Sequence, residues 1–234
     1  MKKKIIKHID KLIYIVVILV CGYFAYQTRY VNVHLQENTI KQFEAQFDVE
    51  REKKPFSLQD ANQTVIGVLY VPSIHLKTSV FDNAEEYAIS NGAGLIRGTG
   101  TLQNEIDNSV ITSHNGDPSK DLFINIPKLK KNDEFFLKLT DGKSDKYLVF
   151  DIREVRPVGE LEQLIEPTDK SIVTLRTCTP IGINNKRFLA AGEFVSQVET
   201  EPSTSGITIS LFEYGLIFIS LISIILLIKS FYKN

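Results

Sequence analysis

The sequence contains little cysteine, with only Cys21 and Cys178 among its 234 residues. Cys21 falls inside an apolar segment near the start, so Cys178 is the only thiol in the polar remainder. A disulfide within that remainder is excluded, and its stability must come from an apolar core, which about 140 residues suffice to form. A single cysteine with histidine elsewhere in the chain is a pattern of catalytic nucleophiles, although a lone cysteine is more often a small buried apolar residue.

Charge of either sign is also not in excess. The 27 basic and 28 acidic residues give a net charge of −1, and no basic cluster lies outside the two ends of the chain. This balance argues against nucleic acid as a partner. The acidic residues are scattered and form no cluster with the spacing of metal ligands. We therefore predict no metal and no cofactor.

Long apolar runs are present at both ends. Segments 12–28 and 207–228 are each long enough to cross a bilayer, the first with help from the isoleucines before it. Lysines concentrate in the flanking tails, 1–11 and 229–234, so the positive-inside rule predicts that both tails are cytoplasmic and the rest is outside. A cleaved signal peptide is the alternative for the first run. No small-residue cleavage site follows it, and several tyrosines resemble an interfacial belt, which favours an uncleaved anchor.

A helix and linker are expected over 29–63, between the first span and the folded domain. The first part is rich in Glu, Gln and Lys, and Ile40, Phe43 and Phe47 recur at helical spacing. This pattern predicts an amphipathic helix that either forms a stalk or packs on the domain.

Residues 64–198 have the pattern of a β-domain, and 199–206 form a second linker. About eight short β-prone runs alternate with turn signals, among them the hairpin turn 140–143. Little helix is expected. The pattern predicts a mainly β fold, a closed antiparallel-dominated barrel, although periodicity alone does not distinguish this from a sandwich.

Cys178 lies at the end of a predicted strand. Most of the run before it is β-branched or apolar, namely Ile172, Val173, Thr174, Leu175 and Thr177, and proline in Thr179-Pro180 cannot continue a ladder. Arg187 opens the next apolar run after a loop rich in turn residues. The thiol and the guanidinium should therefore meet at one end of neighbouring strands, as a nucleophile with an anion stabiliser.

His114 is the histidine expected to act with Cys178. It ends the predicted strand 108–113 and is followed by a strong turn, 115–118. This placement matches that of Cys178. The other histidines lie in the basic tail, after the first apolar run or in another strand: His8, His34 and His75.

These residues also carry a family resemblance. TLRTC at 174–178 resembles the TLxTC signature of the sortases, the cysteine transpeptidases of Gram-positive cell surfaces. TCTPIGINNKR at 177–187 is similar to the form found in the pilus-assembling sortases of class C, and SVITSHNG at 109–116 to the strand that presents the family's histidine. The resemblance implies an eight-stranded sortase barrel, and a second span after the catalytic region also resembles class C.

The resemblance implies a function and roles for residues. His114, Cys178 and Arg187 are the expected catalytic residues, and Thr177 either supports the oxyanion or simply forms strand. Arg176 occupies the variable position of the signature, and we expect it to point into solvent. The substrate would be an LPXTG-like sorting signal of pilin subunits, joined through a thioacyl-enzyme to a lysine of another pilin.

Two alternatives stay open for the function. The first is a cell-wall anchoring sortase, whose acceptor is an amine of a peptidoglycan precursor. The second is a membrane-tethered adhesin or assembly scaffold without enzymatic activity, in which Cys178 is a packed core thiol.

The sequence departs from class C at two places. Asn115 follows the histidine where class C sequences commonly have arginine. The lid motif of that class, Asp-Pro followed by an aromatic residue, is absent. Its nearest counterpart, Lys54-Pro55-Phe56, lacks the acidic residue. Pro55 and Phe56 are therefore weak lid candidates, and we expect the groove over Cys178 to be open or covered by another segment.

Overall fold

The computed structural model separates into two compact units, which are described here one at a time. One contains the two terminal apolar helices, and the other contains the β-domain. The structure describes residues 2–45, 56–58, 63–102, 106–115, 122–160, 164–165, 168–199 and 211–232.

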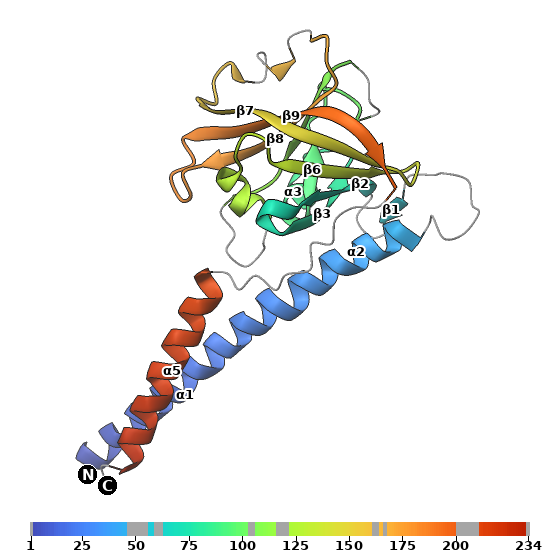
Figure 1. Ribbon diagram of the computed structural model, residues 1–234. Helices are drawn as coiled ribbons and strands as arrows, with labels where there is room; N and C mark the ends of the chain where they lie inside the picture. Colours follow the sequence, from blue (N-terminus) through green and yellow to red (C-terminus); the bar gives the residue numbers. More distant parts are fainter. Residues whose placement is uncertain are drawn as a thin grey trace. The chain divides into compact units, whose positions relative to one another are not determined.

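The β-domain is one sheet that returns on itself (Figure 1). The described strands are β1 (Phe56–Leu58), β2 (Gln63–Val71), β3 (Leu76–Phe81), β4 (Ala93–Leu95), β5 (Asn108–Thr112), β6 (Glu134–Leu139), β7 (Ser144–Val155), β8 (Ile172–Thr179) and β9 (Lys186–Val198). Their order is β1-β2-β3-β4-β5-β8-β9-β7-β6, and β6 also pairs with β2. Eight strands thus form a ring, with β1 beside it. The prediction of a mainly β fold with eight strands in a ring is confirmed.

Two parallel pairings interrupt the antiparallel ladder. β3 pairs in parallel with β4, and β5 pairs in parallel with β8. Short helices lie in the connections: η2 (Pro72–Ile74), α3 (Glu86–Asn91) and η3 (Phe123–Lys128). The β5–β8 pairing matters for function because it brings together two segments about 60 residues apart in the sequence.

The main core fills the ring. Alternate residues of each strand point inward, as the two-residue period of a strand requires. Leu69, Ile111, Phe135, Leu137 and Leu175 are fully buried there. On β8 the inward positions include Leu175 and Thr177, so the residues between and after them face the outer side of the sheet.

A second cluster explains the amphipathic segment before the barrel. Helix α2 (Val33–Ala45) buries Ile40 and Phe43 against residues of β2, β3 and β6. Glu44 accepts hydrogen bonds from the Tyr70 hydroxyl and from Lys77 Nζ at 3.0 Å. The helix therefore packs on the domain, which decides between the two roles expected for it. Phe47 lies outside the described residues.

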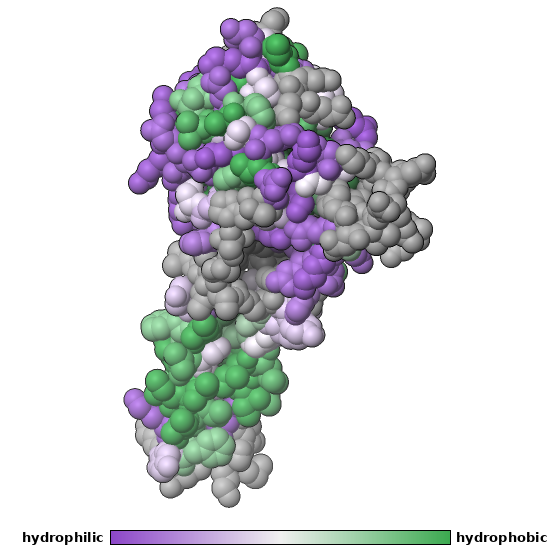
Figure 2. Space-filling view, turned by 45° about the vertical axis from the view of Figure 1, so that its right-hand side comes forward, coloured by the Kyte–Doolittle hydropathy of each residue, from purple (hydrophilic) through white to green (hydrophobic). Residues whose placement is uncertain are grey.

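The terminal helices are long and apolar. Helix α1 (Lys2–Tyr26) continues into a π-helical turn, η1 (Gln27–Asn32), and α5 (Leu211–Tyr232) is its counterpart near the other end. Each contains a stretch long and apolar enough to cross a membrane. Figure 2 shows hydrophobic surface concentrated on these helices. Lys11 Nζ lies 3.9 Å from the Phe231 ring centroid, in cation–π geometry.

Candidate active site

Cys178 lies near the end of β8, on the outer face of the sheet. Thr177 is fully buried, whereas Cys178 is partly exposed, as alternation along a strand predicts. β8 continues one residue further than expected, to Thr179, and then stops at Pro180. The sulfur is thus on the side of the sheet away from the core.

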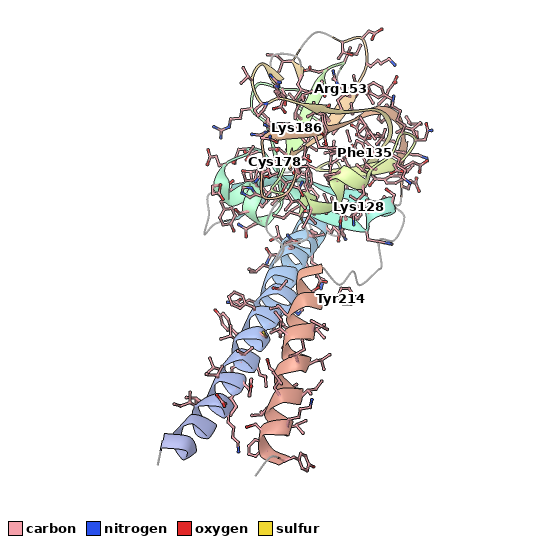
Figure 3. All side chains as sticks on the ribbon, turned by 90° about the vertical axis from the view of Figure 1, so that its left-hand side faces the viewer. Lys128, Phe135, Arg153, Cys178, Lys186 and Tyr214 are labelled. Carbon is pink, nitrogen blue, oxygen red and sulfur yellow. The ribbon has the colours of Figure 1, made fainter. Side chains whose placement is uncertain are left out.

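Arg187 lies directly opposite Cys178. The two are partners in the antiparallel β8–β9 ladder, so their side chains leave the same face with Cβ atoms roughly 5 Å apart. Figure 3 labels Cys178 and Lys186, which belong to these neighbouring strands. Arg187 Nη1 donates to the backbone carbonyls of Asn184 and Lys186, at 3.0 and 2.9 Å. The turn between the strands therefore fixes one end of the guanidinium.

His114 is placed by the parallel β5–β8 pairing. Thr112, the last residue of β5, is opposite Arg176. Two residues beyond Thr112 is His114, and two residues beyond Arg176 is Cys178, so His114 is level with Cys178. The structure therefore brings all three expected residues to one end of three neighbouring strands.

Beyond the end of the β5–β8 ladder, two side-chain hydrogen bonds join the histidine segment to β8. Thr177 Oγ1 donates to the Ser113 carbonyl at 2.9 Å, and Asn115 Nδ2 donates to the Cys178 carbonyl at 2.5 Å. Thr177 was expected to support the oxyanion or to form strand. Its buried hydroxyl is already used on the inner face, so the contact favours the second role. Asn115, noted only as a departure from class C, is buried and touches the strand of the nucleophile.

The imidazole of His114 is partly exposed. Its Nε2 lies 3.2 Å from Oε1 of Glu86, the first residue of α3. The Glu86 side chain is 80% exposed, so this contact is weak in water. His114 Nδ1 makes no hydrogen bond with the described part of the chain.

Arg176 does not point into solvent as we expected. Its side chain is only 20% exposed and forms a two-pronged ion pair with Glu160, with Nε–Oε1 2.5 Å and Nη2–Oε2 3.2 Å. Glu160 lies in the segment that follows β7, and its side chain is 3% exposed. That segment covers the outer face of β8, which alternation alone does not reveal.

A family model described as the sortase domain matches residues 69–195, more than half of the chain. The chain belongs to the sortase family. Its members are cysteine transpeptidases, so the chain is an enzyme of that class.

This sortase is similar to solved structures of class C sortases and to a curated sortase A. It is 30% identical to a pilus-related sortase C of Group B Streptococcus, covering 77% of this chain and 90% of that one, with a TM-score of 0.54. It is also 30% identical to sortase C-1 of Actinomyces oris, with 65% and 82% covered and a TM-score of 0.54. A curated relative, sortase A of Bacillus anthracis, is 28% identical over 184 residues, which are 74% of this chain and 84% of the relative.

The lid of this sortase stays a matter of prediction. Pro55 lies outside the described residues. The backbone of Phe56 belongs to β1 and pairs with Val65 of β2. This pairing ties the backbone of Phe56 to β2, whereas Cys178 is on β8.

Proposed function

We propose that this sortase joins pilin subunits, with Cys178 as nucleophile, His114 as acid and base, and Arg187 as oxyanion stabiliser. The observation that carries the proposal is the pairing of Cys178 with Arg187 across β8 and β9, with His114 two residues beyond the end of the neighbouring β5. Similarity to the pilus-related sortase C of Group B Streptococcus supports the choice of pilin as substrate.

The first half-reaction forms a thioacyl-enzyme. The Cys178 thiolate attacks the carbonyl carbon of the Thr–Gly bond in an LPXTG-like signal, and the carbonyl oxygen becomes an oxyanion. The guanidinium of Arg187 stabilises that charge, and removal of one such donor typically costs about 3–4 kcal/mol of barrier. His114 then gives a proton to the leaving glycine amine.

The second half-reaction transfers the acyl group. The lysine amine of another pilin attacks the thioester, and His114 takes the proton that the amine loses. The Cys178 thiolate leaves, so the enzyme is regenerated and an isopeptide bond has formed. The partly exposed faces of Cys178 and His114 give both substrates access.

The two terminal helices suit an enzyme that acts at a membrane surface. We assign them as anchors in the cell membrane of a Gram-positive bacterium, with both tails cytoplasmic and the catalytic domain outside. The lysines beside both apolar runs support this orientation.

The test mixes the full chain in detergent micelles with a pilin that carries a sorting signal. We expect a ladder of high-mass products that survives denaturing gel electrophoresis. Cys178→Ala should abolish the ladder, whereas Cys21→Ala, which removes the other thiol, should leave it intact. A ladder that is absent with the wild-type chain, or unchanged in Cys178→Ala, would refute the proposal.

Cell-wall anchoring is the second candidate, because the curated relative carries the name sortase A. The chemistry at Cys178 is the same, but the acceptor is an amine of a peptidoglycan precursor. Mass analysis of the joined product separates the two functions. A lysine of pilin at the joint supports polymerisation, and a peptidoglycan stem peptide supports anchoring.

A further inference from the structure

One buried carboxylate lies between two guanidinium groups on the outer face of β8. Arg176 and Cys178 are two residues apart on this strand, so they share a face, and Arg187 opposite Cys178 shares it too. Glu160 reaches this face from the segment after β7 and is almost fully buried. The carboxylate therefore stands beside the proposed oxyanion stabiliser.

The two arginines bind this carboxylate differently. Arg176 hydrogen-bonds to both oxygens, whereas Arg187 Nε is 4.0 Å from Oε2, too far for a hydrogen bond. Arg187 Nε is buried and has no hydrogen-bond partner among the residues that the structure describes. Glu160 thus attracts the charge of Arg187 without accepting a hydrogen bond from its Nε–H.

We propose that Arg176 is a positioning residue that occupies the Glu160 carboxylate, so that Arg187 is not drawn into a hydrogen bond with Glu160 and the charge of its guanidinium stays available to the oxyanion. This inference rests on the role given to Arg187 in the proposed function. It adds a residue from the variable position of the signature to the machinery, acting through Arg187 and without touching the substrate.

Arg176 is well suited to this task. Its planar fork matches a carboxylate with two parallel hydrogen bonds, which a lysine does not reproduce. Its third nitrogen, Nη1, donates to Thr112 Oγ1 at 3.2 Å, which fixes the guanidinium between β5 and β8. Without Arg176, a shift of about 1 Å would let Glu160 accept a hydrogen bond from Arg187 Nε. Arg187 would then be hydrogen-bonded to Glu160, and the carboxylate would partly neutralise the charge of its guanidinium.

A purely structural role predicts different behaviour. The Arg176–Glu160 pair also fastens the segment after β7 to β8, and loss of one partner of a buried pair is destabilising by itself. In that case the effect on Cys178 would not depend on whether Arg187 is present. A double-mutant cycle with Arg187 therefore distinguishes positioning from support of the fold.

The first experiment measures kcat and KM for cleavage of a sorting-signal peptide by the full chain in detergent. Arg176→Met should lower kcat by about tenfold or more, with a smaller change in KM, because an oxyanion donor is weakened. The kcat of Arg176→Lys should lie between those of wild type and Arg176→Met. Adding Glu160→Gln to Arg176→Met removes the competing carboxylate and should return kcat to within about threefold of wild type. Glu193→Gln, which breaks the exposed pair with Lys170, is the matched control and should have no effect.

The second experiment needs no substrate, so it still decides this inference if the wild-type chain cleaves no sorting signal. Cys178 is alkylated with anionic iodoacetate and with neutral iodoacetamide, and the ratio of the two rates is compared. Arg176→Met should lower the ratio toward that of Arg187→Ala. In the Arg187→Ala background, Arg176→Met should change the ratio by less than about twofold. A wild-type ratio in Arg176→Met, or an equal loss with and without Arg187, would overturn the proposal.

Discussion

Exchange of Asn115 for aspartate tests whether the histidine segment is tied to the nucleophile strand. Asn115 is buried, and its Nδ2 donates to the backbone carbonyl of Cys178 at 2.5 Å. Aspartate has nearly the same shape, but an ionised carboxylate has no hydrogen to donate. In Asn115→Asp a carboxylate oxygen therefore faces the carbonyl oxygen of Cys178. The repulsion between these two oxygens should push His114 away from Cys178.

The size of the effect follows from the two parts of the contact. The lost hydrogen bond is worth about 1 kcal/mol, and a buried acceptor left without a donor costs a further ~1–3 kcal/mol. A total of about 2–4 kcal/mol corresponds to a roughly 30- to 1000-fold lower kcat where it is felt in the transition state. Asn115→Ala should lose less, about fivefold, because Asn115 Oδ1 is itself buried with no partner in the described part of the chain, and alanine removes it.

The assay measures kcat and KM for cleavage of a sorting-signal peptide, together with a thermal melt followed by circular dichroism. Asn91→Asp is the matched control, since Asn91 Nδ2 donates to the Tyr87 carbonyl at 2.8 Å on the exposed surface of α3. It should stay within about twofold of wild type. A folded Asn115→Asp enzyme with wild-type kcat, or an equal loss in the control, would refute the reasoning.

Two further predictions concern the β-domain and the helix α2 that packs on it. Gly192→Ala should lower the free energy of unfolding by about 1–3 kcal/mol, since the new Cβ would lie 2.3 Å from Cε1 of the fully buried Phe135 ring; an unchanged melting temperature would contradict this. Burial alone would raise the pKa of Glu44, but hydrogen bonds from Tyr70 and Lys77 outweigh it and lower the pKa below its ordinary 4.5. The stability that the ionised Glu44 carboxylate contributes is fully present above its ordinary pKa of 4.5. It is lost as the pH falls through the lowered pKa. Melting temperatures measured on both sides of this window should fall with acid more steeply in wild type than in Glu44→Gln, and parallel curves would count against it.

The strand ends could be predicted because their signals are local. β-branched residues favour the strand, Pro180 ends it, and the loop to Arg187 is short enough to make the two strands neighbours. The position of His114 beside Cys178 is different, because it depends on the parallel pairing of β5 with β8. No local pattern specifies that pairing. The strand-end placement of His114 singled it out among the histidines, and the family resemblance implied only the barrel that contains this pairing.

The residues around the site were harder to predict because they meet only in the folded chain. Glu160 lies in a long connection with no periodic signal, and Glu86 is an ordinary residue at the start of a short helix. The expectation that Arg176 points into solvent is wrong because the sequence does not show which segment covers this face of β8. Burial of a charged residue on an outer face depends on a loop, and loops have the weakest sequence signals.

The two-residue period of β8 explains why one short signature serves both the fold and the site. Thr177 faces inward and binds the Ser113 carbonyl of the histidine segment, whereas Arg176 and Cys178 face outward with Arg187 and Glu160. A slip of one residue would bury the thiol and expose the threonine. Pairing with β5 on one side and β9 on the other resists such a slip. The same register that presents the sulfur therefore also sets the histidine and the arginine at its level.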